Sequence, residues 1–145
     1  MSIHTHAVPK VKKKTKKEKN TKSYWKEEAD KWFSRWVRKL AANFQGKCQC
    51  VTCGKWFDWE DLQNGHYESR GTHILRYDPR NAHPQCVSCN IFKHGNYQRY
   101  TIFMLKTYGE ALLMEFEEQS KHLIQRTAKD YQVIAEYYKK LFEEL

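Results

Sequence analysis

The cysteines of this sequence carry its clearest chemistry, because four of them fall in two C-x-x-C pairs. The pairs are Cys50 with Cys53 and Cys86 with Cys89. Four thiolates suit a closed tetrahedral Zn²⁺ site, and a gap of two residues lets both sulfurs of a pair turn towards one ion. Because the cysteines would fill all four positions, we expect a structural zinc with no vertex left for a substrate water. Four unrelated buried cysteines and an iron–sulfur cluster are the alternatives.

The fifth cysteine, Cys48, makes the total odd. An odd number argues against a disulfide framework and, without an apolar signal segment, favours metal ligation in a reducing compartment. Cys48 could replace Cys50 as a ligand, although a spare thiol fits its position better. No apolar run reaches the roughly 18 residues needed to cross a membrane, so we expect an intracellular protein with no membrane partner.

Three polar residues near these pairs have the types needed to hydrolyse a phosphodiester bond. The reaction needs a water deprotonated near neutral pH, and histidine has an ordinary pKa of about 6.5, so His66 is our candidate general base. A cation is also needed beside the leaving oxygen, and the amide oxygen of Asn90 is a hard ligand for Mg²⁺ or Mn²⁺. Asn90 directly follows Cys89, so the zinc would fix its position. We expect Asn81 to tie a loop that keeps His66 oriented, with a direct chemical role as the alternative.

The order of these residues resembles the HNH (His-Me finger) nuclease pattern. That pattern has a histidine ending a strand, an asparagine before the third zinc cysteine and a histidine or asparagine after the fourth, matched by His66, Asn81 and Asn90. More closely, the segments GHY, LRYDPRN, H-x-QCVSCN and K-x-GN resemble the lambda NinG (Rap) recombination endonucleases over residues 47–97. The resemblance implies a ββα-metal core with the zinc knuckle at its base, cleavage of branched DNA such as Holliday junctions, and a phage or prophage origin in a bacterial cytoplasm.

One position departs from many HNH sequences, in which an aspartate or histidine directly precedes the general base and binds the metal. Here that position is Gly65, as in NinG-like sequences, so the rest of the catalytic metal shell has no assigned ligand. The candidates are Asn64, His83 and Asp78, with water or phosphate oxygens as alternatives. His83 could also be a turn residue or a phosphate contact, and we favour a supporting role for it.

Charge is unevenly distributed along the chain. Lys and Arg total 26 against 17 Asp and Glu, a net charge of +9. Residues 1–22 hold eight lysines and one glutamate, whereas residues 110–145 are net acidic. A lysine run alone is often a solvated tail, but beside a candidate nuclease site it favours a nucleic-acid partner. Five cations of the central segment are expected to contact DNA phosphates: Arg70, Arg76, Arg80, Lys93 and Arg99.

Hydrophobic periodicity divides the chain into four parts. Residues 1–22 lack apolar periodicity and should be a disordered basic tail. Residues 23–46 have the three- and four-residue apolar spacing of an amphipathic helix, with Ser23 as its N-cap and Gly46 as its stop. Residues 47–96 should form the zinc-stabilised nuclease core, and residues 97–145 a C-terminal helical region.

Within the central part, the sequence predicts two short strands, near residues 55–59 and 62–68, followed by a loop to about residue 79. A short helix should then carry Cys86 to His94. The last helix of the chain should begin at a capping box formed by Thr127 and Asp130.

These features predict an α+β fold: a ββα-metal core with a four-cysteine zinc knuckle, flanked by N- and C-terminal α-helices. The predicted function is a metal-dependent DNA endonuclease with structural Zn²⁺ and catalytic Mg²⁺ or Mn²⁺. A non-catalytic zinc-dependent DNA-binding protein of recombination and a sequence-specific HNH nuclease are the alternatives. Symmetric cutting of two strands would need two active sites, so a homodimer through the last helix fits this scheme; the alternative is that the helices bury one another within one chain.

Overall fold

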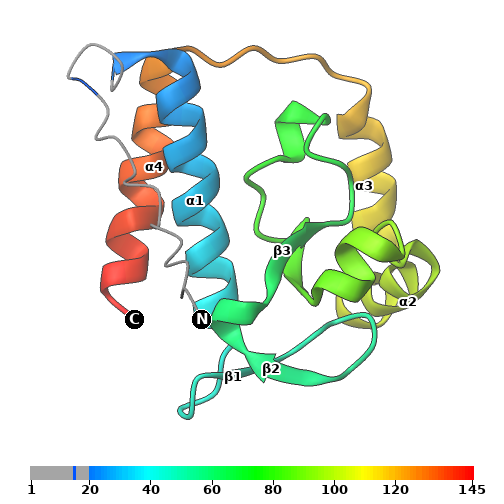
Figure 1. Cartoon of the computed structure of the whole chain (residues 1–145). Helices are drawn as coiled ribbons and strands as arrows, with labels where there is room; N and C mark the ends of the chain where they lie inside the picture. The colour runs from blue at the N-terminus through cyan, green and yellow to red at the C-terminus, as the bar shows by residue number, and fades with distance from the viewer. Residues whose placement is uncertain (1–14, 16–19) are drawn as a thin grey trace, which may run out of the picture.

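The computed structural model describes residue 15 and residues 20–145, so most of the predicted basic tail lies outside the described residues. Figure 1 shows the strand β3 between two helical layers, with α1 and α4 on one side and α2 and α3 on the other. The elements follow in the order α1 (Lys22–Leu40), β1 (Lys47–Gln49), β2 (Trp56–Asp58), η2 (Trp59–Asp61), β3 (Gln63–His66), η3 (His73–Leu75), β4 (Ala82–Gln85), η4 (Ser88–Phe92), α2 (Tyr97–Tyr108), α3 (Glu110–Ser120) and α4 (Ala128–Glu143).

Helices α1 and α4 pack along each other and share one apolar core (Figure 1). Phe33 of α1 is 1% exposed, and its ring lies 4.8 Å from that of Tyr138 on α4 and 5.7 Å from that of Tyr77. The apolar stripe of α4 is therefore covered by α1 of the same chain. Helix α4 begins at the expected capping box, in which Thr127 and Asp130 each accept from the other's backbone N–H.

Helix α1 begins and ends at residues other than the predicted ones. Its N-cap is Thr21, whose hydroxyl accepts from the backbone N–H of Tyr24, and its last helical residue is Leu40 rather than one next to Gly46. The early end has a local cause, because the Asn43 side chain accepts from two backbone N–H groups of the following turn, at 3.0 Å each. An asparagine that satisfies backbone donors in this way competes with helix continuation.

Two separate antiparallel hairpins occupy the centre of the chain: β1 with β2, and β3 with β4. The two expected strands exist as β2 and β3, but they do not pair with each other. Each pairs with a strand that the sequence did not predict. Strand β4 reads Ala-His-Pro-Gln and lacks any alternating apolar pattern, since all four residues are buried by the layers on both sides.

The second helical layer covers the other side of the β3–β4 hairpin. Its buried members, from η3, α2 and α3, are Leu75, Tyr100, Met104, Leu112 and Phe116. The short helix expected after β4 is a π-helix, η4, which begins within the second cysteine pair. Among the described residues, no helix has both the length and the apolar character to cross a bilayer.

Candidate functional site

The four paired cysteines converge on one point. The Sγ atoms of Cys50, Cys53, Cys86 and Cys89 all lie within 4.8 Å of one another. Four sulfurs at roughly 2.3 Å from a tetrahedral zinc would be roughly 3.8 Å apart, so the cluster needs only a small contraction to close on an ion. These four cysteines could therefore bind a metal such as zinc.

Local hydrogen bonds favour the thiolate at one cysteine of the cluster, whereas burial raises the pKa of Cys53 and Cys86. Burial alone would raise the pKa of Cys50, but hydrogen bonds from Thr52 and from backbone N–H groups lower it to about 6. Gly54, with φ of +75°, makes the turn that closes the first pair. Cys48 is 2% exposed in β1 and stands outside the cluster, with its thiol 3.6 Å from the Gln49 carbonyl oxygen.

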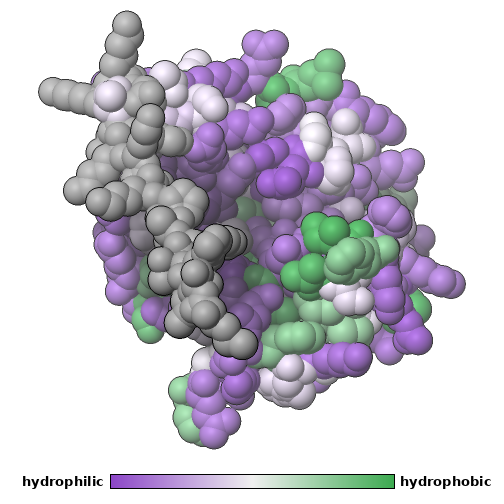
Figure 2. Space-filling view, viewed as in Figure 1, coloured by the Kyte–Doolittle hydropathy of each residue, from purple (hydrophilic) through white to green (hydrophobic). Residues whose placement is uncertain are grey.

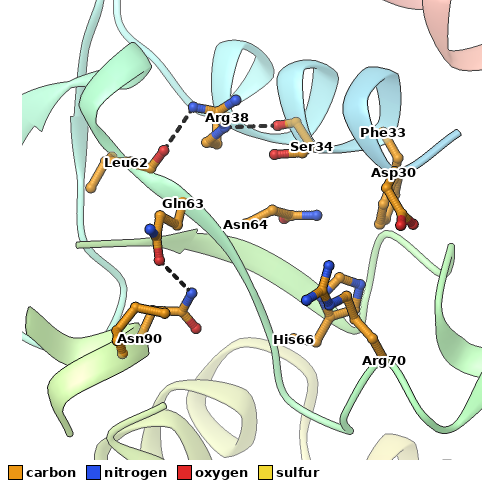
Figure 3. A pocket seen from close by; sticks show the side chains of 11 residues that line it. Asp30, Phe33, Ser34, Arg38, Leu62, Gln63, Asn64, His66, Arg70 and Asn90 are labelled. Carbon is orange, nitrogen blue, oxygen red and sulfur yellow. Dashed lines mark hydrogen bonds between the residues drawn. The ribbon is translucent and has the colours of Figure 1, made fainter. Parts of the chain in front are cut away.

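A polar pocket of about 590 Å³ lies between α1, β3 and η4 (Figure 3). Figure 2 shows this face of the molecule hollowed, with apolar side chains gathered beside the hollow. The pocket lining brings together residues far apart in sequence: Asp30, Phe33, Ser34 and Arg38 from α1, Leu62 to Asn64 and His66 around β3, Arg70, and Asn90 and Ile91 from η4.

The imidazole of His66 is fixed in one orientation. Its Nε2 lies 2.8 Å from the backbone carbonyl oxygen of Arg76, and because a carbonyl only accepts, Nε2 must carry the proton. The lone pair is therefore on Nδ1. Burial lowers the pKa of His66, the Arg76 carbonyl raises it in part, and the cations Arg70 and Arg76 lower it further. At neutral pH the ring is thus a neutral base.

An ion pair between Asp30 of α1 and Arg76 holds in place the Arg76 carbonyl that orients His66. Arg76 is 7% exposed, and its guanidinium donates to both carboxylate oxygens of Asp30, at 2.9 and 2.5 Å. Asp30 also accepts from the Tyr77 hydroxyl at 2.9 Å. The predicted DNA contact at Arg76 is therefore wrong, because this guanidinium is buried and already paired.

Asp30→Ala should lower the free energy of unfolding by about 2–3 kcal/mol, because it leaves the buried Arg76 guanidinium without its partner. Chemical denaturation followed by circular dichroism measures this. The matched control is Asp58→Ala, which removes an exposed pair with Lys47 and should change the stability by less than about 1 kcal/mol. Equal effects of the two substitutions would contradict a bracing role for Asp30.

Asn90 offers one free oxygen to the pocket. Its Nδ2 donates to Gln63 Oε1 at 2.8 Å, and in Figure 3 its oxygen points away from Gln63, on the side of His66. The backbone N–H of Asn90 donates to the Cys86 carbonyl oxygen at 2.9 Å, so the residue is anchored to the cysteine cluster, as its position after Cys89 predicted.

Asn81 lies outside the pocket and serves the loop that precedes η3. Its side chain is fully buried; Oδ1 accepts from the Glu68 N–H at 2.8 Å, and Nδ2 donates to the carbonyl oxygens of Glu68 and Leu75. Its backbone carbonyl accepts from the Tyr67 N–H, directly after His66. These contacts match the loop-tying role and leave the amide no free atom for chemistry.

His83 faces the opposite layer and cannot bind the predicted catalytic ion. The Tyr100 hydroxyl donates to the Gly65 carbonyl oxygen at 2.7 Å, so it must accept from His83 Nδ1. His83 Nε2 then accepts from the Tyr108 hydroxyl at 2.8 Å. Both ring nitrogens are used, and burial lowers the pKa of His83 to about 4. His83 therefore has a supporting role: through Tyr100 it stabilises β3 on the face opposite the pocket.

The structure also explains the glycine before His66. A Cβ at Gly65 would overlap the side-chain amide of Gln85, with Oε1 as the nearest atom. Gln85 is fully buried and cannot swing away, because its Nε2 donates to Thr52 and to the Gly95 carbonyl. Any side chain at position 65 would therefore meet the buried Gln85 side chain.

Asn64 and Asp78 are the other two candidate ligands of the catalytic metal. Asn64 lines the pocket, and its Oδ1 is buried with no hydrogen-bond partner in the described structure. Asp78 instead lies outside the pocket and is bound by the guanidinium of Arg80, at 2.7 Å for the shortest contact.

The predicted phosphate contacts divide into three groups. Arg70 lines the pocket beside His66 (Figure 3). Lys93 and Arg99 are exposed elsewhere, with Lys93 on the side of the cysteine cluster. Arg80 is paired with Asp78 and with Glu115, at 2.7 and 3.0 Å, so its charge is already compensated within the fold. That compensation weakens the case for Arg80 as a phosphate contact, which stays a prediction.

Sequence reasoning missed the contribution of α1 to the pocket. Asp30, Ser34 and Arg38 line it from one face of this helix. The signal was present, because residues spaced by four lie on one helical face, and these three form a polar stripe beside the buried Phe33 and Val37. Gln63 was also missed, and nothing in its spacing marks it.

Fold and site together define a small mixed α+β protein in which two short hairpins carry a four-cysteine cluster able to bind a metal, beside a polar pocket. The family model described as Bacteriophage Lambda NinG protein matches residues 4–145. The chain therefore belongs to the NinG family.

Curated relatives agree with this membership. The chain is 31% identical over 121 residues to the Protein ninG of Salmonella phage P22, covering 83% of this chain and 57% of that protein. It is 31% identical over 123 residues to the Protein ninG of Escherichia phage lambda, with the same two shares. The chain thus spans little more than half the length of these phage proteins. No solved structure matches it.

Proposed function

We propose that this protein is a metal-dependent DNA endonuclease that hydrolyses phosphodiester bonds in branched recombination intermediates such as Holliday junctions. The observation that carries the proposal is the shared pocket of His66 and Asn90, in which each side chain has one polar atom hydrogen-bonded and one without a partner among the described residues. The ββα-metal (HNH) character of the core and the preference for branched DNA rest on the resemblance of residues 47–97.

In this proposal His66 takes a proton from the attacking water. Proton transfer by a positioned side chain is most efficient when its pKa lies near the working pH and its geometry is fixed. The Arg76 carbonyl holds the ring so that Nδ1 is the accepting atom. The lowered pKa of His66 keeps that atom unprotonated at neutral pH.

The other pocket residues would hold the phosphate and a cation. The Asn90 oxygen would bind Mg²⁺ or Mn²⁺, with Asn64 as the remaining candidate for a second oxygen. The bound cation would stabilise charge on the phosphorane and the leaving 3′ oxygen. Arg70 would bind a phosphate oxygen beside His66. Since neither asparagine is charged, we expect the cation to bind together with the DNA phosphate rather than before it.

The four-cysteine cluster would have a structural role and would bind zinc. It joins the turn after β1 to the start of η4, the element that carries Asn90. A metal there would tie η4, and Asn90 with it, to the β1–β2 turn. The homodimer and the intracellular location stay predictions.

An incubation of labelled four-way junctions, nicked duplex and linear duplex with the zinc-loaded protein tests the proposal. We expect nicks near the branch point that need Mg²⁺ or Mn²⁺ and disappear in His66→Ala. If the wild-type protein leaves all three kinds of DNA intact, the nuclease proposal is wrong. Binding without nicks would favour the non-catalytic accessory protein, and preferred cutting at one linear sequence would favour the sequence-specific nuclease.

A further inference from the structure

The side chain of Asn90 can turn its amide in two ways. Rotation about the terminal torsion of asparagine is broad and roughly two-fold, so either the nitrogen or the oxygen can face the pocket. Only the oxygen can bind a cation, whereas the nitrogen would present two hydrogens to it. The backbone anchor of Asn90 at Cys86 does not settle this choice, because it fixes the main chain alone.

In the structure, a side chain from β3 takes the amide nitrogen of Asn90. Gln63 Oε1 accepts from Asn90 Nδ2 at 2.8 Å, between residues 27 positions apart in the sequence (Figure 3). With its nitrogen directed at Gln63, the planar amide of Asn90 must direct its oxygen to the other side. We propose that Gln63 is a positioning residue that turns the Asn90 oxygen towards the cation site. The inference rests on the proposed function, because it assumes that a cation binds at Asn90.

The location of Gln63 makes this role specific. Gln63 and His66 are the first and last residues of β3, and both line the pocket. The strand would therefore carry the proton acceptor at one end and the group that orients the cation ligand at the other. Asn64, the third carboxamide of the pocket, makes no hydrogen bond through its Oδ1 in the described structure, so the Asn90 amide is held by Gln63 and not by Asn64.

Two substitutions separate the orienting contact from simple packing. Gln63→Leu keeps a side chain of similar size and removes the acceptor. Gln63→Glu keeps the acceptor and, since an ionised carboxylate only accepts, forces the Asn90 nitrogen to face it. Gln98→Leu makes the same change as the first variant at an exposed position of α2, away from the pocket, and is the matched control.

The first measurement needs no catalysis. In the zinc-loaded protein, the side-chain amide signals of Asn90 are assigned from their loss in Asn90→Asp, and their exchange with water is followed by NMR. We expect Gln63→Leu to expose the Asn90 amide hydrogens to faster exchange, whereas Gln63→Glu and Gln98→Leu keep the wild-type rate. Titration of Mn²⁺ should broaden these signals in the wild type, in Gln63→Glu and in Gln98→Leu at lower concentration than in Gln63→Leu.

The second measurement is the Mn²⁺ concentration for half-maximal DNA nicking. Gln63→Leu should raise it about five- to tenfold, the loss of one hydrogen bond, with a smaller change in the rate at saturating Mn²⁺. Gln63→Glu should restore it. Unchanged Asn90 signals in Gln63→Leu would overturn the inference, as would a failure of Gln63→Glu to restore them. Absence of nicking by the wild type would defeat the proposed function, while the NMR result would still decide whether Gln63 orients Asn90.

Discussion

Cys86→Ser is expected to lose the metal and to unfold the part of the chain packed around the cluster, which is the β1–β2 hairpin and the start of η4. The core around the cluster is small and made mostly of sulfur, with Leu62 as its one buried non-cysteine member. Structural zinc contributes about 10–16 kcal/mol to the folding of such sites. The apolar contacts of one leucine and two partly buried aromatic rings cannot replace a contribution of that size.

The metal content and the thermal transition measure this prediction together. Wild-type protein should hold one zinc ion and melt cooperatively, whereas Cys86→Ser should hold none and melt at a lower temperature. Cys48→Ser is the matched control, because Cys48 is equally buried yet stands outside the cluster. Retention of the ion and of the wild-type melting temperature by Cys86→Ser would contradict a structural cluster.

The parts of the site that the sequence predicts well are those set by local spacing. Each C-x-x-C turn brings its own two sulfurs together, and Asn90 inherits its place from the adjacent Cys89. The capping box at Thr127 is equally local. In each case the residues that determine the geometry are within a few positions of one another, so the pattern and the cause coincide.

The parts that failed depend on distant partners. Strand β4 is recognisable only through its pairing with β3, because its own sequence has no strand pattern. Arg76 looks like a phosphate contact until Asp30, 46 positions earlier, is seen to bind it. Arg80 is paired with Glu115 from α3 as well as with Asp78, two positions earlier. A charge count along the chain cannot distinguish a paired cation from a free one.

The roles of the two pocket-region histidines could likewise be separated only by the fold. His66 and His83 come from paired strands, and residue 83 is opposite Gly65 rather than opposite residue 66. Neighbouring positions of a strand point to opposite faces, so His66 faces the pocket and His83 faces Tyr100 and Tyr108. The sequence shows two similar candidates; the strand register places one in the pocket and the other against Tyr100 and Tyr108.

Protonation of His83 should lower the free energy of unfolding in mild acid. This loss of stability sets the lowest pH at which reaction rates can be measured. The pKa of His83 is about 4 in the fold, against about 6.5 in an unfolded chain, so the unfolded state binds more protons between these values. Stability contributed by the neutral ring is therefore complete above about pH 6.5 and falls as the pH decreases towards 4. Rates must be compared only where circular dichroism shows a folded protein.

His66→Ala should reduce the rate of DNA nicking about 10²–10⁴-fold, the usual contribution of a positioned general base. Because the reaction needs the neutral ring, the wild-type rate should rise with pH through the pKa of His66 and then level off. Burial lowers that pKa, so the rising limb should lie below the ordinary value of about 6.5. In His66→Ala this limb should be missing, and small imidazoles added to the buffer should restore part of the rate. His122→Ala, at an exposed position, is the control and should keep the wild-type profile. An identical pH dependence in His66→Ala and the wild type would remove His66 from the chemistry, even if the substitution slowed the reaction, because only the group that accepts the proton sets that limb.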